Sequence, residues 1–212
     1  MKIVQPSYQI LTKISDGGID ELMRIEQAAR TCYKSEARMT PDGASAKRLV
    51  SALIKRGHEA MLEHSQLSVK FICDRGVSHE LVRHRLCSFA QESTRYCNYG
   101  KASFGHEITV IDPVFDKDSE VYELWHSTML VCEDTYFQLL ELGYTAQQAR
   151  CVLPNSLKTE VVVTANYREW RKIFELRCSD DAHPDIRRLM IPLRDELRNK
   201  IPIVFDALEE GG

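Results

Sequence analysis

The residues with the clearest potential for chemistry lie between Ser78 and Tyr99. An R-H-R triplet occupies positions 83–85, and after seven intervening residues the run S-T-R-Y occupies positions 93–96. The whole chain has a formal net charge of −3, so this concentration of positive charge is local. Arginine forks bind phosphate oxygens bidentately, and hydroxyls add further donors. The segment therefore predicts a site for one large, multiply charged anion or for two anionic ligands side by side. The alternative is a solvated helix face with ordinary surface ion pairs.

The elements that would position these residues can be predicted from hydrophobic spacing. The sequence GVSHELV predicts a helix capped by Ser78, which would spread Arg83, His84 and Arg85 over consecutive helical positions about 100° apart. LKTEVVVTA is the clearest strand, and the NYREWRKIFELR that follows it predicts a helix with Arg177 near its end. Thr145 and Gln148 form a capping box for a short helix that carries Arg150.

The rest of the chain alternates irregularly between strands and helices. Strands are predicted at 2–14 (at a sheet edge, because of Pro6), 67–73 and 104–112. Helices are predicted from just after Gly18 to about Tyr33 and at 45–57, 119–142 and 183–199, with a short helix or docked tail at 201–208. There is no βαβ rhythm and no glycine fingerprint. We therefore expect an α+β fold, a mainly antiparallel sheet packed with helices in a single domain over residues 1–212, and not a Rossmann fold.

The composition of the chain argues against several classes of protein. The chain has 212 residues, 43% of them hydrophobic, which suits one globular domain, and its pI near 6.2 argues against a general nucleic-acid binder. No apolar run approaches the roughly 20 residues of a membrane span. Seven widely spaced cysteines without a C-x-x-C pair predict reduced thiols in a cytoplasmic protein.

Familiar catalytic motifs are absent from the sequence. His79 and His84 are five residues apart, whereas the helical zinc motif needs its histidines at i and i+4, so we expect no metal. There is neither a P-loop nor a G-x-G-x-x-G sequence. Any dinucleotide would therefore have to be held by side chains such as arginine. Cys87 lies within the cationic segment and could be a nucleophile if its pKa were depressed.

The R-H-R triplet followed by seven residues and S-T-R-Y resembles the signature of flavin-dependent thymidylate synthases. Further matches run from about His58 to Arg177, over more than half of the chain. The resemblance implies a homotetrameric methyltransferase with active sites shared between subunits. It would convert dUMP to dTMP with methylenetetrahydrofolate as carbon donor, NADPH as reductant and FAD as hydride carrier.

The resemblance also assigns roles to individual residues. Arg177 would bind and polarise the uracil ring and is the expected catalytic residue. The other expected substrate-binding residues are Glu80, Arg83, Gln91, Ser93, Arg95 and Arg150. The expected FAD-binding residues are His58, Arg83, His84, Arg85, Gln91, Asn166 and Arg168. The family does not depend on a thiol, so Cys87 is predicted to be non-catalytic, and Trp170 and Phe174 are predicted to be core residues.

The chain departs from the family pattern at four positions. Ala60 replaces a common hydroxyl residue, Ala90-Gln91 replaces Asn-Glu, and Lys172 replaces Asn or His. We expect the first three to weaken flavin binding without removing activity. Two other functions stay open from the sequence. One is a non-catalytic nucleotide- or RNA-binding module, and the other is a flavin enzyme acting on a different pyrimidine nucleotide.

Overall fold

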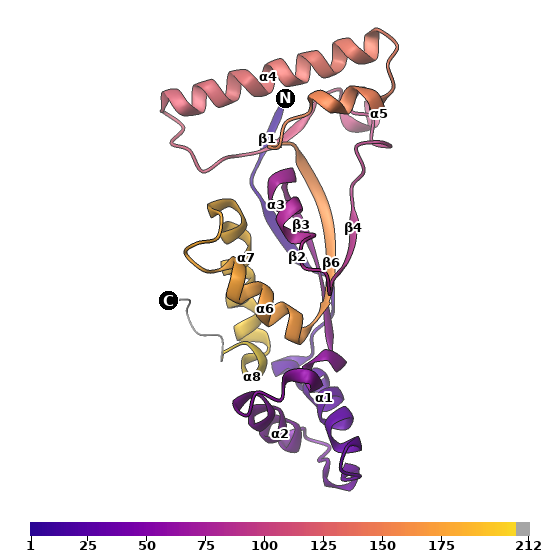
Figure 1. Cartoon of the computed structure of the whole chain (residues 1–212), viewed down its shortest axis with the longest axis vertical. Helices are drawn as coiled ribbons and strands as arrows, with labels where there is room; N and C mark the ends of the chain where they lie inside the picture. The colour runs from indigo at the N-terminus through magenta and orange to yellow at the C-terminus, as the bar shows by residue number, and fades with distance from the viewer. Residues whose placement is uncertain (207–212) are drawn as a thin grey trace. The chain divides into compact units, whose positions relative to one another are not determined.

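The computed structural model describes residues 1–206, and Figure 1 shows its helices and strands. The strands are β1 (Lys2–Val4), β2 (Ser7–Ile10), β3 (Gln66–Asp74), β4 (Ser88–Gln91), β5 (Thr109–Ile111) and β6 (Lys158–Asn166). The α-helices are α1 (Ile19–Thr31), α2 (Ala44–Lys55), α3 (Arg75–Leu81), α4 (Glu120–Glu141), α5 (Ala146–Ala149), α6 (Tyr167–Arg177), α7 (Pro184–Lys200) and α8 (Pro202–Phe205). Short 3-10 helices include η3 (Glu59–His64) and η5 (Arg150–Val152).

Four strands form an antiparallel sheet in the order β2-β3-β6-β4, and β1 pairs with β5 in parallel. The α+β class predicted from the sequence is therefore confirmed. None of the helices in the described part of the chain is long and apolar enough to cross a membrane.

The chain forms two compact units. Unit 1 comprises Met1–Ser7, Phe71–Arg83 and Phe89–Val162, and unit 2 comprises Tyr8–Lys70, His84–Ser88 and, within the described part of the chain, residues 163–206. The single-domain assignment over residues 1–212 stays a prediction, and its last six residues lie outside the described part, as do the last two of the tail predicted at 201–208.

The core of unit 1 forms against the long helix α4. Side chains from five segments contribute to this cluster: Tyr99, Ile108, Val110, Met129, Tyr136, Ala149 and Leu157. Ser119 caps α4 by accepting a hydrogen bond from the backbone N–H of Tyr122 at 3.2 Å, as a serine before a predicted helix should. Helix α5 begins with the expected capping box of Thr145 and Gln148 and packs against α4 (Figure 1).

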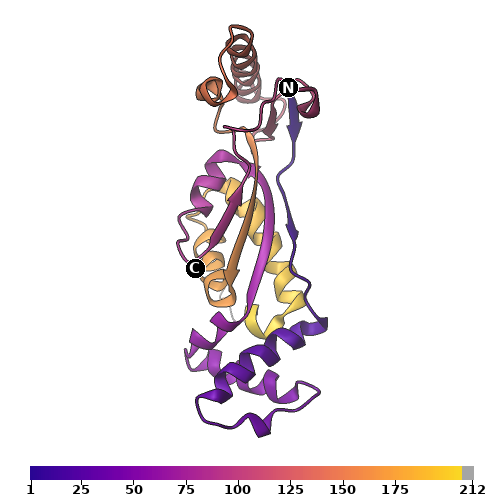
Figure 2. The ribbon, with the colours of Figure 1, turned by 90° about the vertical axis from the view of Figure 1, so that its right-hand side faces the viewer.

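The core of unit 2 includes the large buried side chains of α6 and α7. Trp170 and Phe174 stack at 5.7 Å and are fully buried, so the sequence assigned both correctly to the core. Trp170 Nε1 donates to the carbonyl of Leu67 in β3 at 3.0 Å, which fixes α6 against the sheet. Helices α1 and α2 pack against each other in the same unit (Figure 2).

Two local predictions were wrong, and one strand was missed. The predicted strand 2–14 is two strands, because Pro6 lacks a backbone N–H and the chain changes partner there from β5 to β3. The strand predicted at 104–112 is reduced to β5, preceded by a 3-10 turn at Ala102–Phe104. The strand β4, inside the cationic segment, was not predicted.

The predicted helix before the R-H-R triplet also needs correction. Asp74, not Ser78, caps α3 and accepts from the backbone N–H of Val77 at 2.6 Å. The helix ends at Leu81, and the next two residues, Val82 and Arg83, are exposed, so no apolar packing favours its extension. The triplet is therefore not helical: Arg83 ends a segment of unit 1, and His84 begins one of unit 2.

Candidate active site

The predicted phosphate-binding residues gather within unit 1. Arg95 Nε donates to the side chain of Gln147 at 3.1 Å, and Arg150 Nη1 donates to Thr94 Oγ1 at 3.4 Å. The capping box that starts α5 brings Arg150 to the S-T-R-Y turn, because Arg150 follows directly after this helix. Arg95 and Arg150 are exposed, so their guanidinium groups remain accessible to an anion. We call the residues Ser93, Thr94, Arg95, Gln147 and Arg150 the phosphate cluster.

Gln91, Glu80 and Arg83 lie elsewhere in unit 1. The Gln91 side-chain amide donates to Ser78 Oγ at 2.9 Å and to Thr159 Oγ1 at 3.2 Å, so it ties α3 to β6. The side chain of Glu80 is half-buried, and that of Arg83 is exposed. The structure therefore gives Gln91 a structural role in addition to the ligand contact expected from the sequence.

Two of the predicted cofactor residues of unit 2, Asn166 and Arg168, lie at the start of α6. Asn166 caps this helix by accepting from the backbone N–H of Glu169 at 2.8 Å. Arg168 is exposed and pairs with Glu63 at 2.7 Å. His58 and Arg85 are also exposed residues of this unit.

His84 and Arg177 are in direct contact within unit 2. Arg177 Nε donates to His84 Nε2 at 3.0 Å, and the His84 ring is 7% exposed. Burial first, then the nearby Arg177 and Lys172 charges, lowers the pKa of His84 from 6.5 to about 4. The ring is therefore neutral near pH 7, and its Nε2 lone pair is available to accept.

Glu169 lies on the other side of the same ring. Its Oε1 is 3.8 Å from His84 Nδ1, too far for a direct hydrogen bond. Because the ring is neutral, this contact is not an ion pair, but it favours the tautomer that carries its hydrogen on Nδ1. We call Glu169, His84 and Arg177 the arginine clamp.

The thiol of Cys87 is unsuited to nucleophilic attack. Burial and the nearby carboxylate of Glu169 raise its pKa to about 12, so it stays protonated near pH 7. The cationic neighbours do not depress this pKa, so the alternative of an activated thiol fails and the structure supports a non-catalytic Cys87.

A pocket of about 440 Å³ lies beside the arginine clamp. It is lined by Glu59, Glu63, Leu86, Asn166, Arg168, Glu169, Lys172 and Glu175, all from unit 2. Leu86 offers an apolar side chain that is 75% exposed, and Arg168 and Lys172 offer N–H donors. A flat apolar ring with carbonyl acceptors, such as an isoalloxazine, fits this donor set and wall. The lining also contains four glutamates, of which Glu63 pairs with Arg168, so the residues present fit the uncharged ring of a flavin and not its phosphates.

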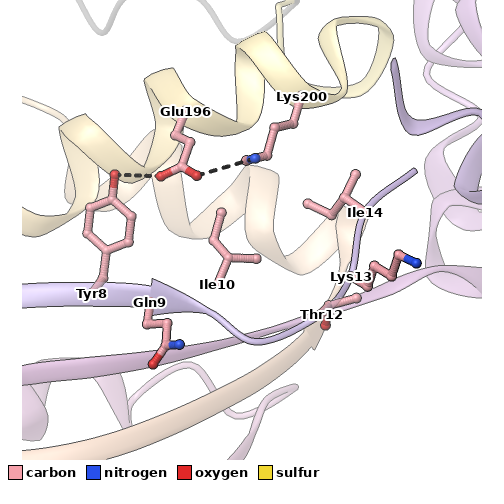
Figure 3. Close-up of a pocket in the computed structure, with 8 residues that line it drawn as sticks. All are labelled: Tyr8, Gln9, Ile10, Thr12, Lys13, Ile14, Glu196 and Lys200. Carbon is pink, nitrogen blue, oxygen red and sulfur yellow. Dashed lines mark hydrogen bonds and ion pairs between the residues drawn. The ribbon is translucent and has the colours of Figure 1, made fainter. Parts of the chain in front are cut away.

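A second pocket of unit 2, about 430 Å³ in volume, contains none of the predicted site residues (Figure 3). It lies between β2 and α7, where Tyr8 donates to Glu196 at 3.0 Å and Glu196 pairs with Lys200 at 3.6 Å. Burial and Glu196 raise the pKa of Tyr8 to about 12. This arrangement joins the strand to the helix.

Sequence reasoning missed Gln147 and Glu169 as members of these clusters, and it gave Thr94 only as a hydroxyl donor of the S-T-R-Y run. Glu169 carried a signal, because an Asn cap followed three residues later by Glu resembles a capping box and places that carboxylate on the first turn. Gln147 gave no comparable signal, since its contact with Arg95 depends on how distant segments pack.

Comparison with known proteins agrees with this geometry. The model of the family described as "Thymidylate synthase complementing protein" matches residues 19–203. A "Flavin-dependent thymidylate synthase" of Geobacter sulfurreducens is 33% identical over 183 residues, which cover 84% of this chain and 78% of that protein. The protein of the same name from Mycobacterium leprae is 33% identical over 218 residues, which cover 93% of this chain and 83% of that protein.

A solved structure extends the similarity to the fold. The crystal structure of "a UMP/dUMP methylase PolB from Streptomyces cacaoi bound with 5-Br dUMP" has a TM-score of 0.79 and covers 100% of this chain and 98% of its own. Its sequence identity of 20% supports a shared fold only. The matches with the family model and with the curated relatives show that the chain belongs to the thymidylate synthase complementing protein family, and they confirm the resemblance to flavin-dependent thymidylate synthases.

Proposed function

We propose that the chain methylates dUMP reductively, using FAD, methylenetetrahydrofolate and NADPH, with the arginine clamp and the phosphate cluster acting on the nucleotide. Its family membership makes it a flavin-dependent thymidylate synthase, a methyltransferase that forms dTMP. We further propose that methylenetetrahydrofolate is its carbon donor and NADPH its reductant, and that the chain is cytoplasmic. The roles of the individual residues given below are proposals of the same kind.

The observation that carries the mechanism is the contrast between Arg177 and Cys87. The uracil C5 carbon is a poor nucleophile, and no activated thiol is available at Cys87 to add to C6. The ring must instead be made electron-rich by stabilising negative charge on it. The Arg177 guanidinium is permanently charged, and its Nε–H is already bound to His84, so its orientation is fixed before the substrate arrives.

The phosphate cluster would hold the nucleotide's monophosphate. Arg95 and Arg150 supply two guanidinium groups, and Ser93 and Thr94 supply hydroxyls. At neutral pH the phosphate carries close to two negative charges, which two exposed arginines can match with charge-assisted hydrogen bonds.

The pocket beside the arginine clamp would hold the flavin. Asn166, Arg168 and Lys172 would donate to it, with Leu86 against its ring and His58 and Arg85 on its polar parts. When bound, the flavin supplies the hydride chemistry. The residues of the chain orient it and exclude water.

The expected homotetramer has a candidate surface on α4. Val121, Leu124 and Val131 are 56%, 71% and 64% exposed at helical spacings of three and seven residues. Thr128, between Leu124 and Val131, and Thr135, one turn after Val131, donate their hydroxyls to carbonyls one turn back, so these hydroxyls are satisfied within the helix. An apolar stripe with a heptad spacing is typical of helices that pack against another helix.

Light scattering tests this assembly. Leu124→Glu and Val131→Glu should reduce the mass from four chains to fewer, whereas Leu130→Glu, which alters an exposed leucine on another side of α4, should not. A tetramer that survives both stripe variants would exclude this surface.

Tritium release from C5-labelled nucleotides tests the reaction itself. With flavin, reductant and methylenetetrahydrofolate present, we expect release from dUMP and little from dCMP or UMP. Release from UMP at an equal rate would mean that the chain acts on a different range of pyrimidine nucleotides. A colourless protein without release would support a non-catalytic binding module.

A further inference from the structure

We propose that His84 is a positioning residue for Arg177: its Nε2 accepts the Arg177 Nε–H and so fixes the orientation in which the guanidinium group faces the uracil. This inference rests on the proposed function for the role of Arg177. It differs from the sequence expectation, in which His84 only contacts FAD.

The donor and acceptor chemistry fixes the direction of this hydrogen bond. A guanidinium has five N–H donors and no acceptor, so His84 Nε2 must carry a lone pair at the observed 3.0 Å. Arg177 Nε lies close to the side-chain stem, and binding it restricts rotation of the whole planar group. The plane of the guanidinium group is thereby fixed, as bidentate recognition requires.

The α6 helix brings the members of the clamp together. Glu169 and Arg177 are eight residues apart, so their backbones are about 12 Å apart along the helix and their long side chains can reach the ring from both ends. His84 is supplied by a different segment, in which its carbonyl accepts from the backbone N–H of Cys87 at 3.1 Å. A ring held by its own turn and faced by two side chains of one helix has little freedom to rotate.

The charges around the ring keep its acceptor available. From α6, Arg177 and Lys172 face it with positive charge and Glu169 with negative charge, and from its own segment the Cys87 thiol is protonated. A proton on Nε2 would place an imidazolium against a guanidinium. We therefore expect the contact to be intact near pH 7 and to break as the pH falls through about 4, the pKa of His84.

Nuclear magnetic resonance of ¹⁵N-labelled arginine tests the contact without using activity. The Arg177 Nε–H should give a slowly exchanging signal, assigned by its loss in Arg177→Lys. His84→Ala should abolish its protection, and His84→Gln, which keeps a side-chain acceptor, should restore much of it. His79→Ala, which alters an exposed histidine of α3, is the matched control and should leave the signal unchanged.

Kinetics then separate positioning from a purely structural role. His84→Ala should lower kcat about 10- to 100-fold, the usual cost of a misplaced catalytic group, and His84→Gln should recover most of this loss. Rates should be compared per bound flavin, so that loss of the FAD contact expected of His84 is not counted as loss of positioning. If His84→Ala fails to fold, His84→Gln carries the test, because its Arg177 signal should survive acidification through pH 4 whereas the wild-type signal should not.

Each result has a definite meaning. An Arg177 signal that is equally protected in His84→Ala overturns the inference. An Arg177 signal that is lost in His84→Ala, in an enzyme whose kcat is unchanged, would also overturn it. An active Arg177→Ala enzyme would instead refute the proposed function, and the spectroscopic result would stand independently.

Discussion

At two places in this chain a strand leads directly into a helix with the same kind of cap, but the two helices differ in length. Each has a nine-residue strand, β3 or β6, followed by a helix whose first turn is capped by the strand's last residue. Asp74 accepts from the Val77 N–H at 2.6 Å, and Asn166 accepts from the Glu169 N–H at 2.8 Å. The first cap starts α3, of seven residues, and the second starts α6, of eleven.

Burial explains the difference in length. Helix α3 buries two apolar side chains, Val77 and Leu81, and its chain leaves the helix before Arg83, which is exposed. Helix α6 also buries Trp170, Ile173 and Phe174, so it continues to Arg177 and delivers that side chain to His84. An arginine held by protein partners suits catalysis, where orientation matters, and exposed arginines suit binding, where the ligand supplies the anion.

The largest effect is expected from removing Arg177, the arginine that is held by protein partners. Arg177→Ala should lower kcat by about 10³-fold, because a preorganised charge on the developing anion is lost, while the fold and flavin content are retained. Single-turnover absorbance measurements give the rate, and circular dichroism checks the fold. Wild-type turnover would remove Arg177 from the mechanism.

An exposed arginine of the phosphate cluster should behave differently. Arg150→Ala should raise the KM for dUMP about 10- to 100-fold with a smaller change in kcat, as expected for one lost charge-assisted hydrogen bond. Deoxyuridine, which lacks the phosphate, is the control substrate, and wild type and variant should use it equally poorly. A defect of the same size with deoxyuridine would contradict the phosphate role.

The pH dependence of stability tests whether His84 is buried and neutral in the folded protein. Its folded pKa of about 4 lies below its ordinary value of 6.5, so the unfolded chain takes up this proton first. Stability from this group is fully present above about pH 6.5 and is lost as the pH falls through 4. Urea titrations should show a smaller loss over this window for His84→Gln than for wild type. Identical losses would mean that His84 is not neutral in the folded protein.

The two caps should contribute similarly to stability. Asp74→Ala and Asn166→Ala should each cost about 1 kcal/mol, a fall in Tm of about 2–4 °C for a chain of this size. Asp74→Asn and Asn166→Asp keep a cap and serve as controls. Only Asn166→Ala should also weaken flavin binding, and equal effects of both variants on the flavin would remove Asn166 from the cofactor site.

The smallest effect is expected at Cys87. Its thiol is protonated near neutral pH, so Cys87→Ala should keep turnover within about twofold of wild type, a change below ~0.5 kcal/mol. Abolished chemistry in a protein with intact flavin binding would show that the thiol is used.

The predictions that succeeded from sequence are those carried by local signals. The β6 strand alternates buried and half-buried residues, and Asn166 followed by a periodic run marks the start of α6. The capping box of Thr145 and Gln148 marks the start of α5 in the same way. These signals were enough to place Arg177 and Arg150 at the ends of their elements.

What failed depended on pairing between distant segments. The triplet at 83–85 has a helix-compatible sequence, but too little of α3 is buried to carry the helix through it. The His84 acceptor for Arg177 joins residues 93 positions apart, and no spacing rule predicts it. The assignments of the remaining ligand contacts stay predictions.

The visible spectrum of the purified chain before and after addition of dUMP tests the central claim most directly. We expect a flavin absorption band that shifts on adding dUMP, and a weakened shift in Arg177→Ala. A protein that takes up no flavin, or a flavin spectrum indifferent to dUMP, would contradict the account.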